Sequence, residues 1–143
     1  MNAEQIALIR SSFDQLVPAA ENLAATFYRR LFEIDPTLRP LFQHDIGLQG
    51  RKFMTMLVVV VRGLDVLDHL LLDVENLGRR HVAYGVRSAH YQAVESALLW
   101  AIQDRLAAQW TPATGAAWAA AYQLLADTMQ RAARDVPDAA SSD

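Results

Sequence analysis

The 143-residue sequence contains no cysteine, which excludes disulfide bonds and thiolate metal sites. It has no block of basic residues and its net charge is −3, which argues against a nucleic acid or an anionic membrane as a partner. The longest apolar run, FMTMLVVVV at residues 53–61, is too short to span a bilayer. The first residues, MNAEQIALIR, lack the basic and apolar regions of a signal peptide. We therefore expect a soluble protein of the cytoplasm.

Hydrophobic residues make up 52% of the chain, which is enough to form one core of ordinary size. The sequence shows no internal repeat and no sign of a second domain. Its last residues are small and polar, as is typical of a frayed end. We expect one domain over residues 1–135 and a polar C-terminal tail over residues 136–143.

Apolar residues recur at spacings of three and four along most of the chain, which is typical of one face of a helix. The first two such faces are Ile6, Ile9, Phe13 and Leu16, and then Leu23, Phe27 and Leu31. Residues that favour helix starts are Pro18, Asp35 before Pro36, Ser88, and Thr111 before Pro112. A long helix should run from Ile46 to Arg62 and end at Gly63. The pattern predicts an all-α fold.

One segment fits this interpretation less well. Val58 to Val61 are four β-branched residues in a row, which in isolation would indicate a strand. In a helix each costs a few tenths of a kcal/mol relative to alanine, and burial of two of them would offset that. No other segment resembles a partner strand, so we predict a helix here.

The sequence contains four histidines, and one of them differs from the rest. His44 and His69 lie in polar turns, and His90 lies at a helix start, so we expect all three to be exposed. His81 follows Leu77 at helical spacing on the apolar side, while Arg79 and Arg80 face outward. A buried histidine needs partners for its ring nitrogens. From periodicity alone, a hydrogen-bonded core histidine is favoured over a metal ligand.

The usual frameworks for catalysis and metal binding are missing. There is no HExxH motif and no histidine pair at zinc spacing, no Gly-rich phosphate loop, and no motif that supports a Ser–His–Asp triad. If His81 binds a metal, it needs a large apolar cofactor that supplies the other ligands. Haem meets that requirement, with one axial imidazole and an apolar pocket.

Three segments together resemble globins: FYRRLFEIDPTLRPLFQ, LGRRHVAYGV, and TPATGAAW followed by a tyrosine. The likeness is greatest to the bacterial single-domain globins near the flavohaemoglobin and neuroglobin groups, and it covers nearly the whole chain. It implies the globin fold, a three-over-three helical sandwich around haem b (iron protoporphyrin IX). It also implies that His81 is the proximal ligand of the iron.

The resemblance implies further roles, position by position. Tyr28 and Gln49 match the distal pair that contacts a bound ligand, and they would be the catalytic residues of a dioxygenase. Taken alone, Tyr28 could be a core aromatic and Gln49 a solvated residue at a helix start. The residues expected to contact the haem are Phe42, Phe53, Leu77, His81, Val86, Tyr91 and Val94. Because position 49 is not a histidine, we expect an open sixth site.

Two positions depart from the family pattern. Phe53 stands where globins often carry leucine or valine, and the larger ring would narrow the pocket or displace Tyr28. The flavohaemoglobins pair the proximal histidine with a tyrosine and a glutamate. Tyr91 takes the place of that tyrosine, but the place of the glutamate falls near Ala133. The missing carboxylate argues against strong peroxidase-like or dioxygenase-like activation.

The leading hypothesis is a haem protein that binds O2 tightly, and also CO and NO. Tyrosine and glutamine are neutral donors to the partial negative charge on bound O2, and each such hydrogen bond contributes about 1.5–3 kcal/mol. The second hypothesis is a nitric oxide dioxygenase that needs an external reductase. A gas or redox sensor and a globin-shaped module without haem are weaker alternatives. We expect a monomer or a weak homodimer.

Overall fold

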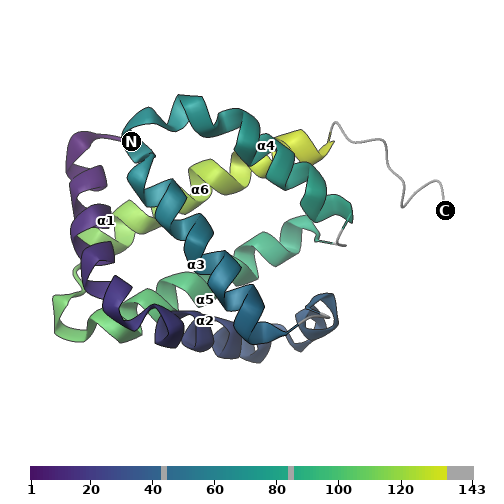
Figure 1. Ribbon diagram of the computed structural model, residues 1–143, viewed down its shortest axis with the longest axis horizontal. Coiled ribbons are helices and arrows are strands. Elements are labelled where there is room, and N and C mark those ends of the chain that lie inside the picture. The colour runs from purple at the N-terminus through teal and green to yellow at the C-terminus, as the bar shows by residue number, and fades with distance from the viewer. Residues whose placement is uncertain (43–44, 84–85, 135–143) are drawn as a thin grey trace.

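The computed structural model describes residues 1–42, 45–83 and 86–134, with the backbone alone for residues 67–71 and 83. Over these ranges the chain is helical and contains no strand (Figure 1). The α-helices are α1 (Ala3–Leu16), α2 (Ala20–Ile34), α3 (Ile46–Arg62), α4 (Leu67–Ala83), α5 (Ser88–Leu106) and α6 (Pro112–Arg134). Short 3-10 helices join several of them: η1 (Val17–Ala19), η2 (Pro36–Leu41), η3 (Leu64–Val66) and η4 (Ala107–Gln109).

Local capping explains where most helices begin. Asp45 accepts a hydrogen bond from the Gly47 N–H at 2.8 Å and starts α3, and Asp35 does the same for Thr37 at the start of η2. Thr111 accepts one from the Thr114 N–H at 3.1 Å before α6. The predicted bounds of α3, from Ile46 to Arg62 with Gly63 after it, are therefore confirmed.

Two predicted helix starts differ in detail. Pro18 lies in η1 rather than in the first turn of α2, which begins at Ala20. Ser88 is the first residue of α5, and Arg87 takes the N-cap position in its place. His90 explains the second difference, because its Nδ1 accepts a hydrogen bond from the Arg87 N–H at 2.9 Å. The His90 ring thus accepts the N–H of the N-cap residue, and His90 is half-buried rather than exposed.

The valine run is helical, as predicted. Val61 is buried and contributes to the core, and Val58 and Val60 are half-buried against it. Val59 is 52% exposed, so it gains little from folding. Burial of the other three offsets the low helix propensity of valine over this segment.

The helices pack in pairs. α4 lies along α6, α2 along α5, and α1 crosses α6, while α2 also contacts α3. The predicted faces of α1 and α2 supply much of the core between them. Its fully buried members include Ile9, Leu16, Leu23, Leu31 and Ile102. None of the helices, over the ranges that the structure describes, is long and apolar enough to cross a membrane.

Glycines set the closest helix approaches. A Cβ on Gly50 of α3 would lie 3.2 Å from the Ala24 Cβ of α2. A Cβ on Gly78 of α4 would lie only 2.4 Å from the backbone oxygen of Met129 on α6. Gly78, which has no side chain, therefore lets the α6 backbone approach α4 closely. This contact fixes α4, and therefore His81 one turn later.

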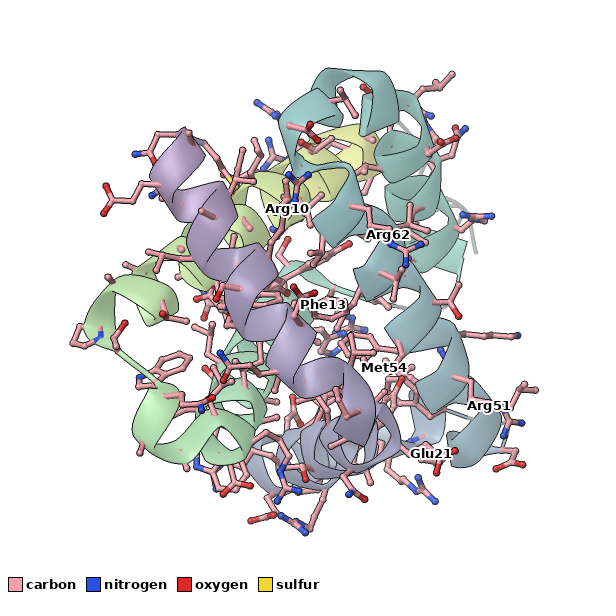
Figure 2. All side chains as sticks on the ribbon, turned by 60° about the vertical axis from the view of Figure 1, so that its left-hand side comes forward. Arg10, Phe13, Glu21, Arg51, Met54 and Arg62 are labelled. Atoms are coloured by element: carbon pink, nitrogen blue, oxygen red, sulfur yellow. The ribbon has the colours of Figure 1, made fainter. Side chains whose placement is uncertain are left out.

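Arg10 ties α1 to the end of α3. Its guanidinium donates to the backbone carbonyls of Val61 at 3.1 Å and Arg62 at 2.9 Å, and to the Asp65 carboxylate at 2.8 Å. Figure 2 shows Arg10 of α1 and Arg62 of α3 close together. A cation at carbonyls that have no helical partner stabilises a helix C-terminus. The hydrogen bond from Arg10 also holds the pKa of Asp65 below its ordinary value.

We predict that Gly78→Ala destabilises the fold by about 1–3 kcal/mol, because the new methyl group would press on backbone that cannot turn away. Urea unfolding would measure the change. Gly47→Ala is the matched control, because its Cβ would meet only the exposed Asp45 carboxylate, at 3.3 Å. Equal stability of the two variants would contradict the role given to Gly78.

Candidate functional site

Tyr28 lies at the centre of an aromatic cluster built by α2, the residue after η2, and α3. Its ring meets Phe27 edge-on at 4.9 Å between centroids and Phe42 edge-on at 5.3 Å. Phe53 of α3 stacks on Phe27 with centroids 4.5 Å apart and the planes 1° from parallel. Phe32 completes the group, 6.1 Å from Tyr28. The structure thus brings three predicted site residues together: Tyr28, Phe42 and Phe53.

The hydroxyl of Tyr28 is buried but held only weakly. The side chain is 4% exposed, and burial raises the pKa of Tyr28 to about 12, so the phenol stays protonated at neutral pH. Its O–H donates to the backbone carbonyl of Gln49 at 3.5 Å. That distance is long for an O–H donor, for which about 2.7–2.8 Å is usual. The bond to this carbonyl therefore costs little to break. The Gln49 side chain lies within reach of the same hydroxyl, because its hydrogen bond partly opposes the rise in the pKa of Tyr28.

Phe53 does not displace Tyr28 from the interior. Its ring is half-buried and lies against Phe27, and its centroid is 6.2 Å from that of Tyr28. Of the two effects expected from a phenylalanine at position 53, the structure thus disagrees with displacement of Tyr28. The half-buried Gln49 precedes Phe53 by one turn on α3, as the helical spacing predicts.

His81 is half-buried near the end of α4. Its Nδ1 contacts the backbone carbonyl of Leu77 at 2.7 Å. A carbonyl can only accept, so Nδ1 carries the proton and Nε2 carries the lone pair. Burial lowers the pKa of His81 from its ordinary 6.5, an effect that outweighs the opposing effect of the Leu77 hydrogen bond. The ring is therefore neutral at pH 7, with a fixed tautomer and the lone pair that a metal ligand needs.

The neighbours of His81 lie as the helical pattern predicts. Arg80 is exposed, and Arg79 pairs with Glu75 at 3.5 Å and donates to Asn76. The Val86 N–H donates to the His81 carbonyl at 3.0 Å and joins the end of α4 to the chain before α5. Among the described residues, no three His, Cys, Asp or Glu lie close enough to hold a metal ion. A metal at His81 would therefore have to bring other ligands with it.

Tyr91 and Ala133 line one cavity of about 190 Å³ where the ends of α4 and α6 meet the start of α5. Its other lining residues are Val82, Val86, Arg87, Ser88, Gln130 and Arg134. Tyr122 of α6 fixes this region, because its hydroxyl donates to the Tyr91 carbonyl at 2.6 Å. Burial, and then the nearby Glu95 carboxylate, raise the pKa of Tyr122, so the hydroxyl stays protonated and donates.

The remaining predicted residues lie in less informative places. Val94 and Leu77 are half-buried, and Val94 packs on the main core. His44 and the side chain of His69 lie outside the described residues, so their predicted exposure stays a prediction. Sequence reasoning missed the contributions of Phe27, Phe32 and Tyr122 to the site. Phe32 could have been found, because it stands four residues after Tyr28 and shares its helix face.

A comparison with protein families matches the Globin model to residues 25–129. Among curated proteins, the chain is 36% identical over 133 residues to a flavohemoprotein of Pseudomonas putida. It is 33% identical over 133 residues to a flavohemoprotein of a Burkholderia species. Each match covers 90% of this chain but 34% of the relative, so the chain spans about a third of the length of these relatives.

Solved structures give the same result. A bacterial globin from Campylobacter jejuni superposes with a TM-score of 0.79 and 25% identity, over 93% of this chain and 96% of that one. A Rhodothermus marinus protein engineered as a carbene transferase superposes with a TM-score of 0.86 and 27% identity, over 100% of this chain and 99% of that one. The fold predicted from the sequence is confirmed.

We predict that Tyr122→Phe lowers the free energy of unfolding by about 1 kcal/mol, because it removes one hydrogen bond to a backbone carbonyl. Urea unfolding followed by circular dichroism would measure it. Tyr91→Phe is the control, since it keeps that carbonyl and its own hydroxyl makes no hydrogen bond within the described part of the chain. A loss of similar size in both variants would mean that the Tyr122 bond contributes nothing of its own.

Proposed function

This chain belongs to the globin family, and we propose that it binds O2 with high affinity through Tyr28 and Gln49, and that it also binds CO and NO. Globins bind haem b, which supplies an iron atom with one position for a diatomic gas. The affinity for each gas depends on the side chains around that position. The buried, protonated and weakly held hydroxyl of Tyr28 is the observation that carries the proposal.

The chemistry of His81 fits the proximal role in haem binding. The imidazole is neutral, and the Leu77 carbonyl fixes both its tautomer and its orientation. Because the described residues form no cluster of protein ligands, a cofactor that brings four nitrogens of its own suits this single ligand. In this arrangement His81 would hold the iron through Nε2.

Tyr28 would stabilise a polar ligand more than an apolar one. Its present acceptor is a carbonyl at 3.5 Å, so turning toward a bound ligand forfeits little. A hydrogen bond to a ligand with partial negative charge is worth about 1.5–3 kcal/mol. O2 gains more from this than CO, because bound CO carries less charge. The Gln49 amide, from α3, is the second donor in the proposal.

A second candidate is nitric oxide dioxygenase, in which NO, O2 and one electron give nitrate. Its support is the likeness to flavohemoproteins over a third of their length. Ala133 argues for a weaker activity, because no carboxylate enters the cavity beside Tyr91 from that position. Rapid mixing of the O2-bound protein with NO, followed by re-reduction with a reductase, tests this candidate. Slow re-reduction would exclude a catalytic role.

We predict that His81→Gly loses most of its haem and that imidazole added to the solution restores binding, because the free ring replaces the missing one. Haem content and the visible spectrum measure both effects. His90→Ala is the control, since that histidine caps α5 and contacts Arg87. If His81→Gly kept its haem and spectrum without imidazole, the proximal assignment would be wrong.

We predict that Tyr28→Phe speeds O2 dissociation at least about tenfold, the equivalent of about 1.4 kcal/mol, and changes CO dissociation much less. Stopped-flow displacement of O2 by CO measures the rate. Thr55→Val, which removes an exposed hydroxyl that bonds only to the Arg51 carbonyl on the outer side of α3, should leave O2 dissociation unchanged. An unaltered rate in Tyr28→Phe would show that this hydroxyl does not reach the ligand.

A further inference from the structure

The outer side of α3 carries a row of exposed residues that neither the core nor the gas site uses. We call it the α3 stripe, and its members are Leu48, Arg51, Lys52, Thr55, Val59 and Arg62. They recur at spacings of three and four, so they share one helix face. Figure 2 shows Arg51 and Arg62 toward the two ends of α3, whereas the buried Met54 lies between α3 and α1.

The charge of the stripe is opposite to that of the molecule. α3 contains three cations and no aspartate or glutamate, while the whole chain has a net charge of −3. Arg51, Lys52 and Arg62 form no ion pair within the part of the chain that the structure describes. The protein is therefore acidic overall but has one helix that is purely basic.

The stripe also exposes apolar surface that folding does not explain. Val59 is 52% exposed and Leu48 is 41% exposed. Valine has a lower helix propensity than alanine, and burial offsets that loss less at the half-exposed Val59 than at the buried Val61. Apolar side chains between charged ones are typical of protein–protein interfaces, which have an apolar centre and a polar rim.

The position of the stripe links it to the gas site. Gln49 and Phe53 lie on the same helix, and Phe53 contacts Phe27 on the inner side. A helix with its side chains is about 10–12 Å across. A partner seated on the stripe would therefore stand about one helix diameter from the side chains that face the ligand.

We propose that the α3 stripe is the docking surface for an acidic electron-carrier protein that reduces the ferric form of the protein. The inference rests on the proposed function, because only a redox-active cofactor needs such a donor. The carrier loses one electron and the ferric iron gains it, so no other reactant is required. A second copy of this chain fits the stripe poorly, since like charges would then face each other.

The test uses chemically reduced flavodoxin, a strongly acidic flavoprotein, as the probe. Stopped-flow absorbance would follow reduction of the ferric protein from about 20 mM to about 300 mM NaCl. Two net-negative proteins that meet without orientation repel, and salt then speeds their reaction. If the carrier docks on the stripe, we expect the reduction rate to fall with increasing salt instead, by at least about fivefold over this range.

Charge-reversal variants inside and outside the α3 stripe show whether the stripe itself determines the reduction rate. Arg51→Glu with Lys52→Glu should slow reduction at low salt at least about tenfold and reverse the salt dependence. Arg105→Glu with Arg131→Glu changes the net charge equally, on α5 and α6, and should leave the sign of the salt dependence unchanged. Val59→Ser should slow reduction without altering the salt slope, because it removes apolar contact but no charge.

The outcomes separate this inference from the proposed function. Binding of oxidised flavodoxin to the immobilised protein reports docking whether or not haem is present. The protein could carry haem and bind gases, yet be reduced faster as salt increases or be slowed equally by both double variants. That result would overturn the docking surface and leave the proposed gas binding standing. A different result would assign the stripe to membranes: the protein co-sediments with phosphatidylserine vesicles, the Arg51→Glu, Lys52→Glu variant does not, and neither binds flavodoxin. That result would also overturn the proposed docking surface.

Discussion

The chemistry of the site depends on one hydrogen bond, from Nδ1 of His81 to the carbonyl of Leu77. Donor and acceptor lie four residues apart on one helix, so the bond forms wherever α4 forms. It selects one tautomer, leaves the lone pair on Nε2, and limits rotation of the ring. Burial keeps the ring neutral. The packing of α4 then has only to place this oriented ring.

What the sequence predicts well is local. Asp35 and Thr111 cap the elements that follow them, as predicted, because a cap needs only a short side chain and the next turn. The face of His81 follows from helical spacing for the same reason. The stack of Phe27 on Phe53 and the bond from Tyr122 to Tyr91 join residues far apart in the chain. No local pattern specifies those partners, so they required the structure.

The sequence offers two interpretations of Tyr28; the structure confirms the core aromatic, and the distal role stays a prediction. The ring is a core aromatic, 4% exposed and surrounded by phenylalanines. Its polar end is held loosely by a distant carbonyl. Packing of the ring therefore fixes the position of the hydroxyl, and the weak bond leaves its direction adjustable. A rigid ring with an adjustable donor is a suitable arrangement for recognising a small polar ligand.

The contact between Gly78 and Met129 also affects what comparison of related sequences could show. Gly78 contributes no side chain to this contact and residue 129 contributes only backbone atoms, so the contact does not depend on which amino acid stands at position 129. Selection acting on this contact would therefore hold position 78 as glycine while leaving position 129 free to drift. Such a pair produces no correlated substitutions. Methods that infer proximity from covariation would thus not detect the approach that positions His81.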